Sequence, residues 1–270
     1  MSLLDWIFPA RCAGCHSPGS AWCAACARSL EPLRAEWAPG VPFIAAGRLE
    51  GPWQRAVHSF KYLPRPQLAA ALARPLEAAV LESGLALSAL AWIPLHPSRE
   101  RERGFNQSER LARVLARSLG VPLCGGLRRV RPTAPQVGLS QAVRRANVAG
   151  AFRWQASPPP PGLGLGLVDD VLTTGATLQA AEAALAAAGG RLGAVLVLAV
   201  RGEGRPLVAQ TLPHPAVTSP GKDCASQLGG APISDLACGS GVNGQRVRSL
   251  AGRARTVLRG AGPDPGPRPR

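Results

Sequence analysis

The chain has 270 residues, of which 46% are hydrophobic, so it can form a real core in one large domain or two modest ones. Its 31 basic and 16 acidic residues give a formal net charge of +15, which favours a polyanionic partner, either nucleic acid or a phosphorylated small molecule. No apolar stretch is long enough to span a bilayer, and MSLLDWIFPA lacks the basic region of a secretion signal, so we expect no membrane span and a cytoplasmic protein.

The N-terminal segment is predicted to be a small unit built on two Cys-x-x-Cys pairs, Cys12 with Cys15 and Cys23 with Cys26. Each pair can bend two thiolates onto one ion, and two pairs complete a tetrahedral Zn²⁺ site. Four cysteines close such a site, so the zinc is expected to be structural rather than catalytic. The alternatives are a disulfide, which a reducing cytosol disfavours, and a redox-active Cys-x-x-Cys.

After the cysteines, apolar strands alternate with amphipathic or Ala/Leu-rich helices. The expected helices are 68–82, 105–120 and 177–188. The expected strands are 163–168, 193–200 and one within 90–96 that Pro94 and the following turn end. Pro75 is expected to kink or restart the first helix, and Gly120 to end the second. Because the strands are almost continuously apolar, they predict a parallel sheet covered by helices on its faces.

Two adjacent aspartates, Asp169 and Asp170, stand at the end of the strand in LGLGLVDDVLTTGAT. Ligands of parallel α/β sheets bind at the carboxyl ends of the strands, and the carboxylates suit ribose hydroxyls or Mg²⁺ held through water. The loop that follows enters a helix N-terminus, which favours an anion, and it lacks the lysine of a Walker A loop. The predicted phosphate-loop residues are Thr173, Thr174, Gly175, Ala176 and Thr177. The alternative is a buried acidic pair that only caps the helix.

Three further blocks carry basic residues that suit a diphosphate. They are residues 58–73 with Lys61 and Tyr62, residues 93–112 with Arg99, Arg101 and Arg103, and residues 136–152 with Arg144, Arg145 and Asn147. The first two blocks also have simpler interpretations. The RERERG run can be a solvated turn, His96 can cap a turn, and Lys61 can be an ordinary exposed lysine.

The stretch LVDDVLTTGAT resembles the phosphoribosyl pyrophosphate (PRPP) signature of type I phosphoribosyltransferases. Together with the basic blocks and the cysteines, it makes residues 1–202 resemble the ComF family, competence-associated relatives of amidophosphoribosyltransferases. The resemblance implies that Asp169 and Asp170 are catalytic at the ribose of a Mg²⁺–PRPP complex and that the loop holds its 5-phosphate. It implies a pyrophosphate and flap region made by Leu95, His96, Arg101, Arg103, Asn106, Gln107, Arg144 and Arg145.

The implied fold is α/β, a type I phosphoribosyltransferase fold with a mainly parallel sheet flanked by helices and a small N-terminal zinc-binding unit. We therefore expect a zinc-ribbon-like unit over 1–40 and a phosphoribosyltransferase-like domain over 41–202. Residues 203–270 lack a useful period and end in low-complexity sequence, so they are expected to be a mostly disordered tail.

Two functions fit these features. The first is a PRPP-dependent transferase whose acceptor the sequence does not name. The second is a non-catalytic module that senses PRPP or a nucleotide, or binds single-stranded DNA, and partners a DNA-uptake helicase. The absence of a glutaminase domain with an N-terminal cysteine nucleophile argues against a complete amidophosphoribosyltransferase.

Overall fold

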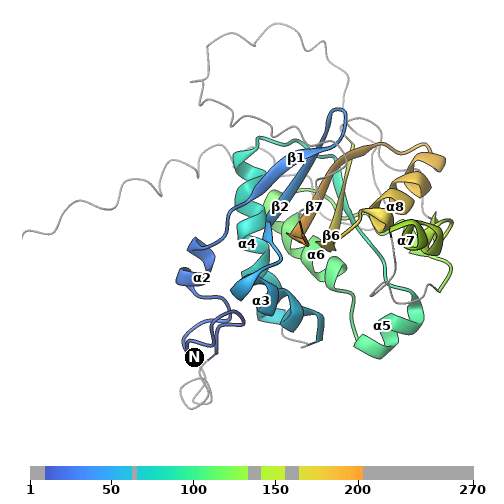
Figure 1. Ribbon diagram of the computed structural model, residues 1–270. Helices are drawn as coiled ribbons and strands as arrows, with labels where there is room; N and C mark the ends of the chain where they lie inside the picture. Colours follow the sequence, from blue (N-terminus) through green and yellow to red (C-terminus); the bar gives the residue numbers. More distant parts are fainter. Residues whose placement is uncertain (1–9, 63–65, 133–140, 156–163, 203–270) are drawn as a thin grey trace, which may run out of the picture. The chain divides into compact units, whose positions relative to one another are not determined.

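A computed structural model describes residues 10–62, 66–132, 141–155 and 164–202 of the chain. Its centre is a five-stranded sheet in the order β1-β2-β7-β6-β3 (Figure 1). The strands are β1 (Leu33–Ala38), β2 (Val41–Arg48), β3 (Ala89–Trp92), β6 (Leu165–Leu172) and β7 (Leu192–Val200). Strands β2, β7, β6 and β3 are parallel and β1 is an antiparallel edge strand, which confirms the predicted mainly parallel sheet.

Helices cover both faces of this sheet, because neighbouring residues of each strand point to opposite sides. On one face, Val168 and Leu196 pack with the helices α3 (Gly51–Tyr62), α4 (Pro66–Glu82) and α6 (Gln107–Leu119). On the other face, Leu167 and Val197 pack with α8 (Ala176–Ala187) and with a two-stranded ribbon. The ribbon pairs β4 (Leu127–Arg129) with β5 (Phe152–Trp154), and α7 (Gln141–Val148) contacts α8. Figure 1 shows α4 and α6 on one side of the sheet and α7 and α8 on the other.

The predicted helices are present with shifted ends. Helix α6 begins after Asn106, whose side chain accepts a hydrogen bond from the amide of Glu109, and ends at the left-handed Gly120 as predicted. Helix α4 is a single element that includes Pro75, so the helix does not restart there. The short helices α2 (Ala24–Arg28) and α5 (Pro97–Arg103) complete the described set.

One strand prediction is confirmed and one needs correction. The strand predicted to end at Pro94 runs over Ala89–Trp92, because Pro94 has no amide hydrogen for a ladder and α5 begins soon after it. Strand β6 continues to Leu172, so the two aspartates lie within its C-terminal half rather than after its end. Backbone pairing of Asp169 with Val197 extends the strand past the apolar run.

Glycine at positions 164 and 166 reflects close packing. A Cβ on Gly164 would lie 2.7 Å from the Cα of Gly193, and a Cβ on Gly166 would lie 2.6 Å from a methyl group of Leu90. Any side chain at these positions would therefore push neighbouring elements apart. The glycines let β6 pack closely while it carries the aspartates at its other end.

The division predicted at residue 40 stays a prediction, although β1 lies before it and pairs with β2 in the main sheet. The predicted tail, 203–270, lies outside the described residues. Within the described parts of the chain, none of the helices combines the length and hydropathy needed to cross a membrane.

Candidate functional site

A cavity of about 290 Å³ lies at the carboxyl ends of the four parallel strands. Each strand leads directly into it: β2 into Leu49, β3 into Ile93 and Leu95, β6 into Thr173, and β7 into Arg201. Parallel strands end on the same edge of a sheet, so loops that are far apart in sequence meet there. This is the edge at which the sequence predicts a ligand.

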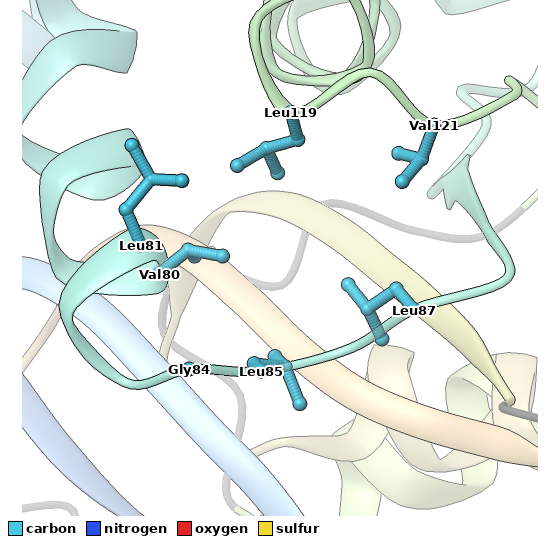
Figure 2. Close-up of a pocket in the computed structure, with 7 residues that line it drawn as sticks. All are labelled: Val80, Leu81, Gly84, Leu85, Leu87, Leu119 and Val121. Carbon is cyan, nitrogen blue, oxygen red and sulfur yellow. The ribbon is translucent and has the colours of Figure 1, made fainter. Parts of the chain in front are cut away.

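A second cavity, of about 260 Å³, has a different character (Figure 2). Its lining residues are Val80, Leu81, Gly84, Leu85, Leu87, Leu119 and Val121. Figure 2 shows these aliphatic side chains gathered from the end of α4, the segment that follows it, and the end of α6. No charged or hydroxyl side chain lines this second cavity, so only the first of the two cavities offers groups that can bind a charged ligand.

The acidic pair lines the first cavity and is held by three interactions. Asp169 Oδ1 accepts hydrogen bonds from Ser108 Oγ at 2.9 Å and from the Asp170 amide at 2.8 Å. Lys61 Nζ lies 3.2 Å from Asp170 Oδ1. Burial, with the neighbouring charge of Asp170, raises the pKa of Asp169 to about 7, although the two hydrogen bonds favour the carboxylate. Asp169 therefore titrates near neutral pH.

Because its pKa is raised, Asp169 lowers the free energy of unfolding as the pH rises. A carboxyl with a raised native pKa contributes stability that is present below about pH 4 and is lost as pH rises through about 7. The Asp169→Asn variant keeps an oxygen acceptor at this position and does not ionise, so it does not lose stability in this way. Thermal melts are expected to show Asp169→Asn more stable than the wild type at pH 8, by a few degrees, with the advantage shrinking toward pH 5. A difference that is constant with pH would contradict the raised pKa.

The predicted phosphate loop, Thr173–Thr177, is shaped by a single glycine and a tryptophan behind it. Gly175 is the N-cap of α8 with φ 78°, and a Cβ there would lie 2.9 Å from the Trp37 ring. Trp37 is fixed by a 2.8 Å hydrogen bond from its Nε1 to Glu182 Oε2 of α8. The buried Oγ1 of Thr174 has no hydrogen-bond partner among the described residues. The loop thus turns abruptly into a helix N-terminus, and Gly175, Ala176 and Thr177 at this terminus line the cavity.

Replacing Gly175 by alanine is expected to lower stability by two separable effects. The positive φ costs about 1 kcal/mol, and the clash with Trp37 adds about 1–3 kcal/mol. Gly189→Ala is the matched control, since Gly189 has φ 77° but no atom lies within 4 Å of the position that its Cβ would take. Chemical denaturation should show the larger loss for Gly175→Ala, and equal losses would mean that Trp37 does not constrain the loop.

Basic side chains surround the acidic pair. The basic residues that line the cavity are Lys61, Arg99, Arg103, Arg129 and Arg201. Burial lowers the pKa of Arg129, and the nearby positive charge of Arg99 lowers it further. Two guanidinium groups that repel each other in a partly buried position favour an anion between them. Five cations and two carboxylates give the cavity a positive balance that suits a polyphosphate.

The four N-terminal cysteines also form one cluster. Their sulfur atoms all lie within 4.8 Å of one another, and Cys15 Sγ is 3.6 Å from Cys23 Sγ. Four ligands at the usual Zn–S distance of about 2.3 Å would have sulfurs about 3.8 Å apart. The amides of Gly14 and Cys23 each donate to Cys12 Sγ at 3.4 Å, which favours a thiolate. The arrangement therefore fits a structural metal such as zinc.

This cysteine cluster packs against α3. Arg55 Nε donates to the carbonyl of Gly14 at 2.6 Å, and the Trp22 and Trp53 rings lie 5.1 Å apart between centroids. Trp53 Nε1 in turn donates to the Leu198 carbonyl of β7 at 2.9 Å. The cysteine cluster is thus continuous with the hydrophobic core that contacts β7.

No family model matches the chain, but individual proteins do. DNA utilization protein YhgH of Salmonella typhi is 37% identical over 202 residues, covering 63% of this chain and 88% of the relative. The chain belongs to the ComF family. Competence protein F of Haemophilus influenzae is 40% identical over 89 residues, 32% of this chain and 39% of the relative.

This ComF-family chain is also similar, at low identity, to solved structures that include the following two. Glutamine PRPP amidotransferase from B. subtilis matches with a TM-score of 0.35 and 20% identity, covering 52% of this chain and 30% of that one. Adenine phosphoribosyltransferase matches with a TM-score of 0.31 and 19% identity, covering 66% and 92%.

The structure brings most of the residues predicted for a ComF-type site to one cavity. Those that line it are Leu95, Arg103, Gln107, Asp169, Asp170, Thr173, Gly175, Ala176 and Thr177. His96 instead caps α5, where its Nδ1 accepts from the Ser98 amide at 3.3 Å. Asn106 is buried and donates to the Ile93 carbonyl at 3.2 Å, and Arg101 is exposed outside the lining. The side chains of Arg144 and Arg145 lie outside the described residues.

Five polar side chains at the cavity were not predicted as site residues of this ComF protein: Lys61, Arg99, Ser108, Arg129 and Arg201. Arg201 directly follows β7, and a basic residue at the end of a parallel strand was a usable signal. Lys61 is one of only two lysines beside 29 arginines, which made it conspicuous without giving it a role. Ser108 and Arg129 carry no signal in their local sequence.

Proposed function

We propose that this ComF-family protein binds PRPP with Mg²⁺ in the cavity at the carboxyl edge of its sheet and acts in DNA uptake as a phosphoribosyltransferase-like protein. The observation that carries the proposal is the convergence of three groups on one cavity: an acidic pair, a helix-N-terminal loop and five basic side chains. A ligand that satisfies all three has a diol, a monophosphate and a more highly charged anion.

The two phosphate groups have different partners in this proposal. The loop Thr173–Thr177 offers amides, hydroxyls and the α8 N-terminus, which suit one monophosphate. Arg99, Arg103 and Arg129 also line the cavity, and their forked donors suit a diphosphate. The acidic pair on β6 lines the same cavity, where it would hold the part of the ligand between the two phosphate groups.

Asp169 and Asp170 would accept hydrogen bonds from the two ribose hydroxyls. Hydrogen bonds to carboxylates are stronger than those to neutral acceptors, so the pair fixes the ring between the two phosphate positions. The oxygen-only donor set also fits Mg²⁺, which prefers carboxylates, phosphates and water. When bound with PRPP, Mg²⁺ supplies positive charge that offsets the negative charge of the diphosphate.

In a transfer reaction, the bond between the anomeric carbon and the diphosphate oxygen breaks, and that oxygen takes the electron pair. A nucleophile then forms its bond to the same carbon. The chain's contribution is to hold the ribose by its hydroxyls and to stabilise the departing charge with guanidinium groups that are already in place.

The DNA-uptake role is supported by the names of the relatives, DNA utilization protein and competence protein. We propose that the protein acts in the cytoplasm beside a DNA-uptake helicase, where the PRPP site either transfers a phosphoribosyl group or reports nucleotide supply. The cysteine cluster would hold zinc and keep the N-terminal unit folded.

The transferase proposal is tested by pyrophosphate release. Purified full-length protein with PRPP and Mg²⁺ is offered nucleobases, ammonia and amines as acceptors, with and without single-stranded DNA. Release above the acceptor-free rate with one acceptor supports catalysis. Tight PRPP binding with no release for any acceptor would favour the sensing role.

A second candidate function, binding of single-stranded DNA, rests on charge distribution. Residues 110–168 include nine arginines and no acidic residue. In the ribbon, exposed Arg128 stands directly opposite exposed Arg153, an unfavourable pair that a phosphate backbone would relieve. Such binding should weaken steeply with salt and persist in Asp169→Asn/Asp170→Asn protein. Binding that is lost with the aspartates would instead place the DNA in the PRPP cavity.

A further inference from the structure

We propose that Lys61 is the counter-ion of the acidic pair in the ligand-free protein. When the ligand binds, a divalent cation that it carries takes the place of the Lys61 ammonium beside the aspartates. The arrival of a divalent cation with the ligand rests on the proposed function, whereas the pairing of Lys61 with the aspartates concerns the protein alone. The consequence is a specificity rule: the cavity accepts a divalent cation only together with a polyphosphate.

The first support is where the ammonium lies. Lys61 Nζ is 3.2 Å from Asp170 Oδ1, and both groups line the cavity. The side chains are only 25% and 14% exposed, so this is not an ordinary solvated lysine. A partly buried ion pair inside a ligand cavity interacts more strongly than a surface pair.

The second support is that the backbone of Lys61 is fixed independently of its charge. Its carbonyl accepts a 3.0 Å hydrogen bond from Gln107 Nε2, and Gln107 Oε1 accepts one from Arg103 Nη1 at 3.0 Å. Gln107 is 1% exposed, and Arg103 also lies over the Tyr62 ring at 5.4 Å. The end of α3 is thereby clamped in a position from which the lysine stem extends toward the aspartates.

The third support is the charge balance of the pair. Asp169 and Asp170 adjoin each other along β6, and Lys61 is the ammonium that offsets them, with Arg129 also near Asp169. Removing one positive charge next to two carboxylates raises the attraction of the pair for any other cation. A divalent ion that arrives on a diphosphate brings negative charge with it. It therefore does not need a site beside the aspartates that is free of other cations beforehand.

Lysine suits this role better than arginine, although the chain uses arginine almost everywhere else. An ammonium is a compact point charge with three rotatable donors, so it can swing from a carboxylate to an incoming phosphate oxygen. A guanidinium would form a rigid two-point bond with Asp170 and fill more of the cavity.

The test measures Mn²⁺ binding to ligand-free, zinc-loaded full-length protein by the loss of the free-ion signal in electron paramagnetic resonance. Wild type and Lys61→Arg are expected to bind weakly, because both keep a cation beside Asp170. Lys61→Met is expected to bind one Mn²⁺ at least about tenfold more tightly, the equivalent of one pKa unit at the pair. The gain should vanish in Lys61→Met/Asp170→Asn.

Equal Mn²⁺ affinity in the wild type and Lys61→Met would overturn the counter-ion role, as would tight binding by the ligand-free wild type. Thermal melts check that every variant is folded. A parallel titration with Mg²⁺ and PRPP separates the two proposals. If PRPP fails to bind the wild type while Lys61→Met gains Mn²⁺, the PRPP function falls and the counter-ion role stands.

Discussion

Replacing both aspartates of β6 by asparagine is expected to abolish binding of Mg²⁺–PRPP while leaving the protein folded. Asp169 and Asp170 are the only acidic side chains that line the described cavity, and each is expected to accept one ribose hydroxyl. A hydrogen bond to a charged group is worth about 1.5–3 kcal/mol, so losing both charges should weaken binding at least about 100-fold. Isothermal titration calorimetry measures the loss, and each single substitution should show part of it.

Folding should survive these substitutions because asparagine keeps the hydrogen-bond acceptor that Ser108 and the Asp170 amide use. Glu31→Gln, at an exposed position outside the cavity, is the control for loss of one negative charge. If the double variant binds PRPP as the wild type does, the acidic pair is not the ribose site and only caps the local structure.

Removing the metal from the cysteine cluster is expected to have the second large effect. Cys12 and Cys26 are buried in the same core cluster as Trp53, so the N-terminal unit and α3 share packing. Structural zinc contributes most of the folding energy of small thiolate units. We expect Cys26→Ser or a strong chelator to lower the melting temperature by at least about 10 °C.

Cys124→Ser is the matched control, since Cys124 is also buried but lies outside the cysteine cluster. It should change stability by less and leave the metal content intact. Elemental analysis of protein purified under reducing conditions should find one zinc per chain. Protein that contains no metal, or a Cys26→Ser variant that melts like the wild type, would contradict the structural-zinc proposal.

The features that could be predicted from the sequence are those contained in one continuous stretch. The acidic pair and the loop Thr173–Thr177 adjoin each other along the chain, so their order alone indicates a strand, a turn and a helix N-terminus. The four cysteines are likewise readable, because the ligand spacing within each pair is local. The parallel sheet followed from the apolar strands and the helices between them.

The basic side chains that line the cavity could not be predicted in the same way. Lys61 comes from α3, Arg129 from a three-residue strand and Arg201 from the end of β7, and only the topology brings them together. Strands as short as β4 and β5 show no periodicity that a sequence pattern can detect. The role of these basic residues depends on which edge of the sheet the topology brings them to. Local residue preferences do not determine the topology.

The β1–β2 hairpin was missed although a local signal exists. Pro39 and Gly40 separate the two strands, and Gly40 has φ 72°, as the third residue of a type II turn requires. Strand β1 of the hairpin places Trp37 behind Gly175. Because the hairpin was not predicted, the contact of Trp37 with the predicted phosphate loop was not predicted either.

The most direct test of the PRPP site is a calorimetric titration of the zinc-loaded full-length protein with PRPP, with and without Mg²⁺. We predict one PRPP bound per chain, with affinity that depends on Mg²⁺ and is lost in Asp169→Asn/Asp170→Asn. No heat of binding, together with no thermal shift at millimolar PRPP and Mg²⁺, would contradict the proposed site.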